Sequence, residues 1–70
     1  MKFSLKLVHK LGVWESDINE ANEEEYETVV EFVEQAAKGK TSYFNFQNKG
    51  VEYYFPEDII KQSIILIIKH

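Results

Sequence analysis

The chain of 70 residues contains no cysteine and no arginine, only one proline and only three glycines. Without cysteine there is neither a disulfide framework nor a thiolate metal site, which fits a reducing compartment. Without arginine, the chain lacks the planar side chain that binds phosphate, carboxylate or guanine through two hydrogen bonds at once. No apolar run approaches the ~20 residues that cross a bilayer, and the first residues do not form a signal-peptide pattern. We therefore expect a cytoplasmic protein that does not contact membranes.

Seventy residues allow one compact domain, spanning residues 1–70, and no more. A chain of this size buries only about 60% of the surface that its unfolded form exposes, so its core is small. Twelve acidic side chains against eight lysines give a net charge of −4, which disfavours general binding to nucleic-acid backbones. Because no disulfide can stabilise this small core, we expect association with another chain to contribute.

The first part of the chain predicts a strand followed by a helix. Residues 3–13 alternate apolar side chains with lysines and small residues, which indicates one long strand, bent near Gly12. Residues 15–22 are polar and typical of turns. Asn22 and Glu25 have the spacing of a capping box, in which each side chain bonds the backbone N–H of the other residue. A helix should therefore begin directly after Asn22.

Along this helix the apolar side chains recur every three or four residues and form one stripe: Tyr26, Val29, Val30, Val33 and Ala37. The glutamates at 23, 24, 27, 31 and 34 fall outside the stripe and should face water. Phe32 lies about 120° around the helix from Tyr26, at the margin of the packed face. The sequence Lys38-Gly39-Lys40 predicts the end of the helix, because it combines cations with a glycine that can adopt positive φ.

The second half of the chain predicts a hairpin, a short helix and a last strand. Residues 41–47 and 51–55 should pair through the connection at residues 48–50, a type I turn with a G1 bulge. Residues 56–62 should form a short helix with Ile59 and Ile60 turned inward, and residues 63–69 the last strand. The fold class is then α+β: one four-stranded, mainly antiparallel sheet with one main helix packed on one face. The residues expected to face the helix are Phe3, Leu5, Leu7, Phe44, Phe46, Val51, Tyr53 and Phe55.

The segment Ser63 to Lys69 is a short apolar run that a strand would expose on both faces, because successive side chains point to opposite sides. One helix cannot cover both faces of a sheet, so another chain should bury part of this surface. A homodimer accounts for it most economically. Trp14 is the best single anchor for a contact, although it could equally cover the end of the sheet. The expected interface residues are Trp14, Phe32, Ile65, Ile67, Tyr43 and Tyr54.

Catalytic chemistry has little support in the sequence. The two histidines are His9, in the first strand, and His70, and neither belongs to a nucleophile motif. A metal site that joins His9, His70 and a carboxylate is conceivable if the first and last strands pair, but its spacing is not diagnostic. The glutamates at 23–25 are explained by the helix start, where negative charge is favourable. We therefore expect a protein that is not an enzyme and that uses no cofactor.

Single-stranded nucleic acid is the alternative ligand. An open sheet face with Lys2, Lys6, Tyr43 and Tyr54 could stack bases on the tyrosines and neutralise phosphates with the lysines. The negative net charge, the absence of arginine and the absence of an RNP-like motif make nucleic acid the weaker expectation.

The arginine-free composition and residues 53–65, which read YYFPEDIIKQSII, resemble the small proteins of bacteriophages and mobile elements of AT-rich Gram-positive hosts. The resemblance covers about the last third of the chain and carries no functional residues over. Such proteins often bind a host enzyme or defence protein and block it. The resemblance therefore implies a viral-type inhibitor or modulator that acts by stoichiometric binding to a larger host protein.

Overall fold

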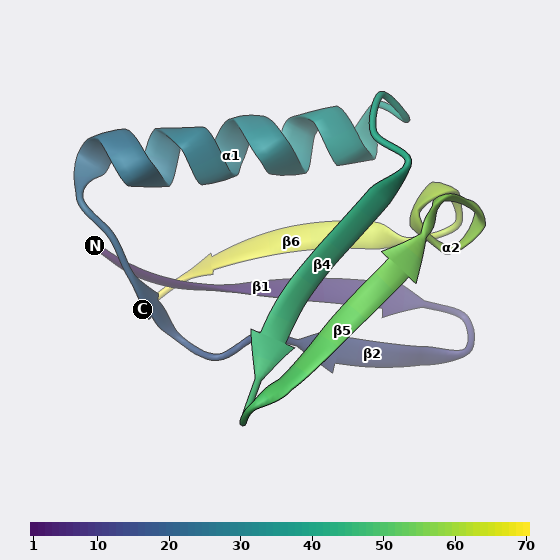
Figure 1. Cartoon of the computed structure of the whole chain (residues 1–70), viewed down its shortest axis with the longest axis horizontal. Helices are drawn as coiled ribbons and strands as arrows, with labels where there is room; N and C mark the ends of the chain where they lie inside the picture. Colours follow the sequence, from purple (N-terminus) through teal and green to yellow (C-terminus); the bar gives the residue numbers. More distant parts are fainter.

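A computed structural model describes all residues from Met1 to His70 and arranges them in two layers (Figure 1). Strands β6, β1 and β2 lie side by side, the hairpin β4–β5 crosses in front of them, and helix α1 runs along one side. The elements follow the order β1 (Lys2–His9), β2 (Gly12–Glu15), β3 (Asn19–Glu20), α1 (Glu23–Ala37), β4 (Tyr43–Asn48), β5 (Val51–Pro56), α2 (Glu57–Lys61) and β6 (Ile64–Lys69). The α+β class and the expected order of helices and strands are confirmed.

Strand β1 is the centre of a four-stranded antiparallel sheet. Strand β6 pairs with one edge of β1, while β2 and β3 pair with the other edge. The predicted long first strand is wrong, because the chain turns after His9 and returns as β2. The predicted loop at 15–22 also contains strand residues. Between β2 and β3, Ser16 bonds to Leu5 of β1: the Leu5 N–H donates to Ser16 Oγ at 2.8 Å, and the Ser16 N–H donates to the Leu5 carbonyl at 2.7 Å.

The hairpin β4–β5 forms a separate two-stranded sheet and does not extend the sheet around β1. The sequence correctly predicts a four-stranded sheet, but β2 and β3 take the places expected for the two hairpin strands. The physical reason is that both edges of β1 are already paired, and α1 packs mainly along β6 and α2, reaching Phe3 and Phe44 only through Tyr26 and Phe32. The remaining inner face of the sheet needs another cover, and the aromatic face of the hairpin provides it.

The core lies between the two layers. Leu7 and Phe44 are both 0% exposed, and the Phe44 ring contacts Phe32, Phe46 and Phe55 at centroid distances of 5.3, 5.9 and 6.2 Å. The buried apolar residues are Phe3, Leu5, Leu7, Val33, Ala36, Phe44, Phe46, Phe55 and Ile60. Tyr53 packs partly against them, as expected, whereas Val51 is 51% exposed, so its predicted place in the core is wrong. Val51 directly follows the hairpin turn, where the hairpin extends past the opposite sheet (Figure 1).

Local signals in the sequence place both helices correctly. The Glu25 N–H donates to Asn22 Oδ1 at 2.8 Å and the Asn22 N–H donates to Glu25 Oε1 at 3.0 Å, which is the predicted capping box. Gly39 has a φ of 71°, as expected for the residue that ends α1. Pro56 is the N-cap of α2, and Ile60 is buried beneath it.

The turn between β4 and β5 differs from the predicted type. Asn48 pairs with Val51, so the connection has two residues, and both have positive φ: 50° at Lys49 and 79° at Gly50. This is a type I′ turn, whose twist matches the right-handed twist of the two strands better than the predicted type I turn does.

Candidate interaction surface

The side of the four-stranded sheet that faces away from α1 and the hairpin is called the outer face here. It carries the apolar side chains Val8, Val13, Ile64, Leu66 and Ile68, together with Ser4, Lys6 and Glu15, because these residues alternate with the buried positions of their strands. Ile64 is 62% exposed, Val13 56% and Leu66 41%, although all three are large apolar residues in strands. No other element of the chain covers them.

The strand register arranges the outer face in rows across the sheet. Ile64, Val8 and Val13 lie opposite one another and form an apolar row on β6, β1 and β2. In the next row Leu66, Lys6 and Glu15 lie opposite one another, so an ammonium and a carboxylate adjoin the apolar row. These two rows of the outer face are therefore apolar apart from one charge of each sign, and a further pair of opposite charges, Lys2 and Glu20, lies at the far end of β1.

Lys6 has no carboxylate within ion-pair distance, since the only ion pair of the structure joins Lys61 Nζ to Glu57 Oε1 at 3.1 Å on α2. Glu15 is instead held by Ser4, whose Oγ lies 3.1 Å from Glu15 Oε1. A partner that covers the outer face must therefore supply a negatively charged group to Lys6, because an unpaired buried charge is costly.

Ser4 links three strands through its hydroxyl. Its Oγ lies 2.8 Å from Nε2 of His70, the residue that directly follows β6, and 3.1 Å from Oε1 of Glu15 on β2. Ser4 is only 1% exposed. The adjoining shallow hollow is lined by Ser4, Glu15, Ser16, Asp17, Ile18, Asn48, Lys49 and His70.

This group contains the residue types of a hydrolytic triad in a different arrangement. In a triad the carboxylate orients the imidazole, whereas here the carboxylate of Glu15 bonds the hydroxyl of Ser4. When that hydroxyl donates its proton to Glu15, His70 Nε2 must be the donor to Ser4 and cannot act as a base. The arrangement fits a structural link from β6 through β1 to β2.

His9 lies at the other end of β1. Its side chain is buried, its Nδ1 accepts the Leu11 N–H at 3.0 Å, and its Nε2 is buried without a hydrogen-bond partner. The His9 ring is therefore tied to the backbone of the turn that follows β1. Strands β1 and β6 do pair, but antiparallel, so His70 adjoins Lys2 and lies roughly 20 Å from His9 along the strand. The conceived metal site with both histidines is wrong, and no group of three His, Asp or Glu side chains is close enough to hold a metal ion.

The expected interface residues do not form one surface. Ile65 and Ile67 point inward, where they lie opposite Leu7 and Leu5 and pack against the core. Phe32 stacks on Phe44 with an interplanar angle of 22° and forms the edge of the core. The strand does expose one of its two faces, as its apolar run predicts, and the exposed residues are Ile64 and Leu66.

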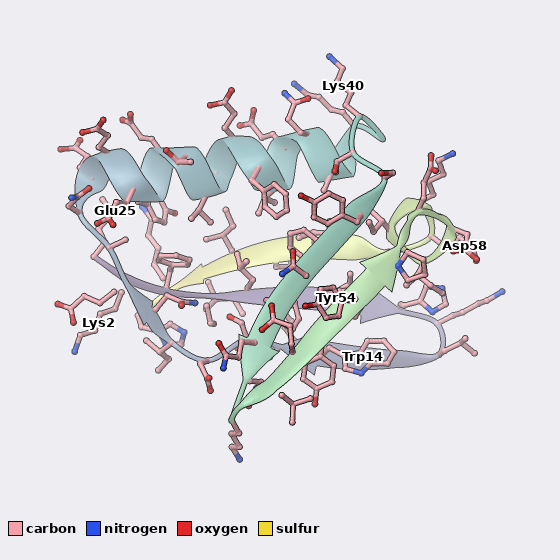
Figure 2. All side chains as sticks on the ribbon, viewed as in Figure 1. Lys2, Trp14, Glu25, Lys40, Tyr54 and Asp58 are labelled. Atoms are coloured by element: carbon pink, nitrogen blue, oxygen red, sulfur yellow. The ribbon has the colours of Figure 1, made fainter.

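Trp14 is half-buried between the two layers. Its ring packs edge-on against Phe55 at a centroid distance of 5.8 Å, so it partly covers the end of the core. Tyr43 and Tyr54 are 58% and 73% exposed on the side of the hairpin that faces away from the core. Figure 2 shows Tyr54 on β4–β5 and Lys2 at the distant end of β1.

The surface expected for nucleic acid is therefore divided. Lys2 and Lys6 occupy the phase of β1 that points away from the hairpin, while Tyr43 and Tyr54 point away from the sheet on the opposite layer. The four side chains were expected on one open sheet, and that expectation is wrong because the hairpin forms its own sheet. Stacking and phosphate neutralisation thus have no common face.

Sequence reasoning missed the role of Val13. It was placed in a continuous first strand, and only the turn after His9 brings it next to Val8 on the outer face. The two-residue spacing of Val13 and Glu15 with Gly12 before them is the signal that could have indicated a second strand.

No protein-family model, no curated protein and no solved structure matches this chain. No helix of the structure has the length and apolar character needed to cross a membrane.

Proposed function

We propose that this protein is a small, non-enzymatic binding module that self-associates through the outer face and acts by stoichiometric binding, as an inhibitor or modulator of a larger host protein. The observation that carries the proposal is the exposure of Ile64, Val13 and Leu66 in contiguous strands. Large apolar side chains grouped on one face of a small protein mark an interaction site more often than single exposed ones do.

A second copy suits the outer face because of its charges. Beside the apolar row, each copy carries one unpaired ammonium, that of Lys6, and one carboxylate, that of Glu15. Two copies packed face to face can pair these groups across the interface, so neither charge is buried alone. The apolar side chains are at the same time removed from water, which is the main favourable contribution to association.

The size of the outer face indicates weak self-association. Three strands about 4.8 Å apart and three rows about 6.8 Å apart give a flat footprint of roughly 300 Å² per copy before its rim is added. Stable complexes bury about 800 Å² per partner, and small interfaces belong to transient complexes. A weak homodimer would release the outer face to a larger partner that buries more of it.

The proposal is tested by measuring the solution mass by light scattering after size exclusion, from about 10 μM to about 1 mM protein. The wild type should change from monomer to dimer within this range, and Ile64→Glu should remain monomeric because it places a carboxylate in the apolar row. Tyr54→Glu is the matched control, since it adds the same charge to an exposed strand residue of the other layer. A monomeric wild type at the highest concentration, or an Ile64→Glu variant that dimerises like the wild type, would contradict the proposal.

A further inference from the structure

Strand β5 has a free edge. Because the turn at Lys49 and Gly50 has two residues, the closing pair Asn48 and Val51 exchanges backbone hydrogen bonds, and every second pair after it does the same. Tyr53 and Phe55 therefore bond to β4. The N–H and C=O groups of Glu52 and Tyr54 point to the opposite side.

The outer edge of β4, in contrast, is hydrogen-bonded at one end. There the Asp17 N–H donates to the Gln47 carbonyl at 2.9 Å, which joins β4 to the segment between β2 and β3. On β5, no hydrogen bond outside the ladder uses the backbone groups of Glu52 or Tyr54. Proteins usually protect such edges with lysine, proline or a bulge. Here Pro56, at the end of the strand, and the charged Glu52 are the only such features, and Glu52 disfavours pairing with an acidic strand alone.

An aromatic side chain lies beside this edge. Trp14 is half-buried and contacts Phe55 of β5 at a centroid distance of 5.8 Å, and Figure 2 shows it on the side of β5 away from β4. Tyr53, also half-buried, points to the same inner side of β5 as Phe55. An added strand would therefore place its inward side chains against Trp14 and Tyr53.

The outward side of the same edge carries Glu52 and Tyr54, which is 73% exposed. Glu52 is the one charged side chain of β5, and its Oε1 accepts a hydrogen bond from Asn45 Nδ2 at 2.9 Å. A second copy of β5 would bring another carboxylate to this side and no cation. A lysine on a different chain would supply the missing charge and could also lie over the ring of Tyr54.

We infer that the free edge of β5 binds an extended segment of a partner protein, which adds a strand to the hairpin. Up to four backbone hydrogen bonds, from the N–H and C=O groups of Glu52 and Tyr54, hold the segment. Its side chains alternate between apolar residues, which contact Trp14 and Tyr53, and cations, which face Glu52. This edge lies on the layer opposite the outer face, so the inference does not depend on self-association.

The test uses the full chain and a capped hexapeptide of alternating lysine and valine as the probe. Binding is followed by the fluorescence of Trp14, the single tryptophan of the chain, and by NMR hydrogen exchange of the Glu52 and Tyr54 amides. In the free protein these two amides should exchange quickly, in contrast to those of Tyr53 and Phe55. Saturating peptide should slow their exchange at least about tenfold, because they become hydrogen-bonded.

Tyr54→Pro should weaken peptide binding about tenfold or more, since it removes an edge N–H while leaving the β4 ladder unchanged. Tyr54→Thr is the matched control, because it removes the ring and keeps the N–H. In this variant, peptide binding should slow the exchange of the amide at 54 as it does in the wild type. A peptide of equal charge with N-methylated backbone nitrogens should not bind the wild type, which tests the inference even if Tyr54→Pro fails to fold.

Three results would overturn the inference: no binding at about 1 mM peptide, equal binding of the N-methylated peptide, or amides of Glu52 and Tyr54 that are already protected in the free protein. The last result would mean that a second copy or another part of the chain occupies the edge. Ile64→Glu, which tests the outer face, should bind the peptide like the wild type. Failure of one proposal is thereby distinguishable from failure of the other.

Discussion

Truncation of Phe44 should remove a large part of the stability of this protein. Phe44 is 0% exposed and its ring contacts three other phenylalanine rings, so Phe44→Ala leaves a cavity where the hairpin meets the sheet. Phenylalanine-to-alanine changes in cores cost about 3–5 kcal/mol. At 0.05–0.15 kcal/mol per residue, a chain of 70 residues has about 3.5–10 kcal/mol of stability in total. The loss is therefore about a third of the stability of the fold or more.

The assay is thermal unfolding followed by circular dichroism, with urea unfolding as the second probe. A loss of 3–5 kcal/mol should lower the melting temperature by at least about 12 °C, since each kcal/mol shifts it by roughly 4–8 °C in a domain of this size. The control is Tyr54→Ala on the same hairpin, where the side chain is 73% exposed and the expected loss is below about 1 kcal/mol. If both variants lose the same small amount, the hairpin does not pack on the sheet through Phe44 and the two-layer description is refuted.

Three further pairs of substitutions test other parts of the fold. Ile65→Thr should lower the free energy of unfolding by about 2 kcal/mol, and Ile64→Thr should lower that of the monomer by less than about 0.5 kcal/mol, because only Ile65 packs against the core. Equal losses would show that the assigned faces of β6 are wrong. In urea unfolding, Lys49→Asn should raise the free energy of unfolding by several tenths of a kcal/mol, since asparagine tolerates the positive φ of a type I′ turn. Gly50→Ala should lower it by about 1 kcal/mol. A destabilising Lys49→Asn together with a stabilising Gly50→Ala would argue against that turn. Asn22→Ala should cost about 1 kcal/mol and Asn22→Asp much less, because aspartate can still accept the Glu25 N–H; an equal cost for both would mean that the cap is not formed.

Features with strong local signals were predictable from the sequence. The capping box at Asn22 and Glu25 fixes the start of α1, and Pro56 with the following acidic residues fixes α2. The apolar run that forms β6 correctly indicated more apolar surface than one helix can cover, and Ile64 is exposed. These features depend on residues close together in the chain, which is why a sequence pattern suffices to identify them.

Features that depend on long-range pairing were not predictable. Strand β2 is an edge strand with Glu15 among its residues, so its pattern resembles a turn, and β3 is held by backbone pairing with β1 alone. The two phases of β6 are equally apolar, so the sequence could not determine that Ile65 rather than Ile64 faces the core. The hairpin forms a separate sheet because β6, β2 and β3 pair with both edges of β1, and this pairing is a property of the whole fold.

The outer face is the central feature of this account, and methyl NMR tests it most directly. Spectra recorded over a dilution series report which side chains enter an interface as the protein associates. The methyl signals of Val13, Ile64 and Leu66 should shift together with concentration, while those of Ile65 and Ile67 stay constant. Signals that do not change anywhere, or changes confined to the hairpin at Tyr43 and Tyr54, would contradict self-association through the outer face.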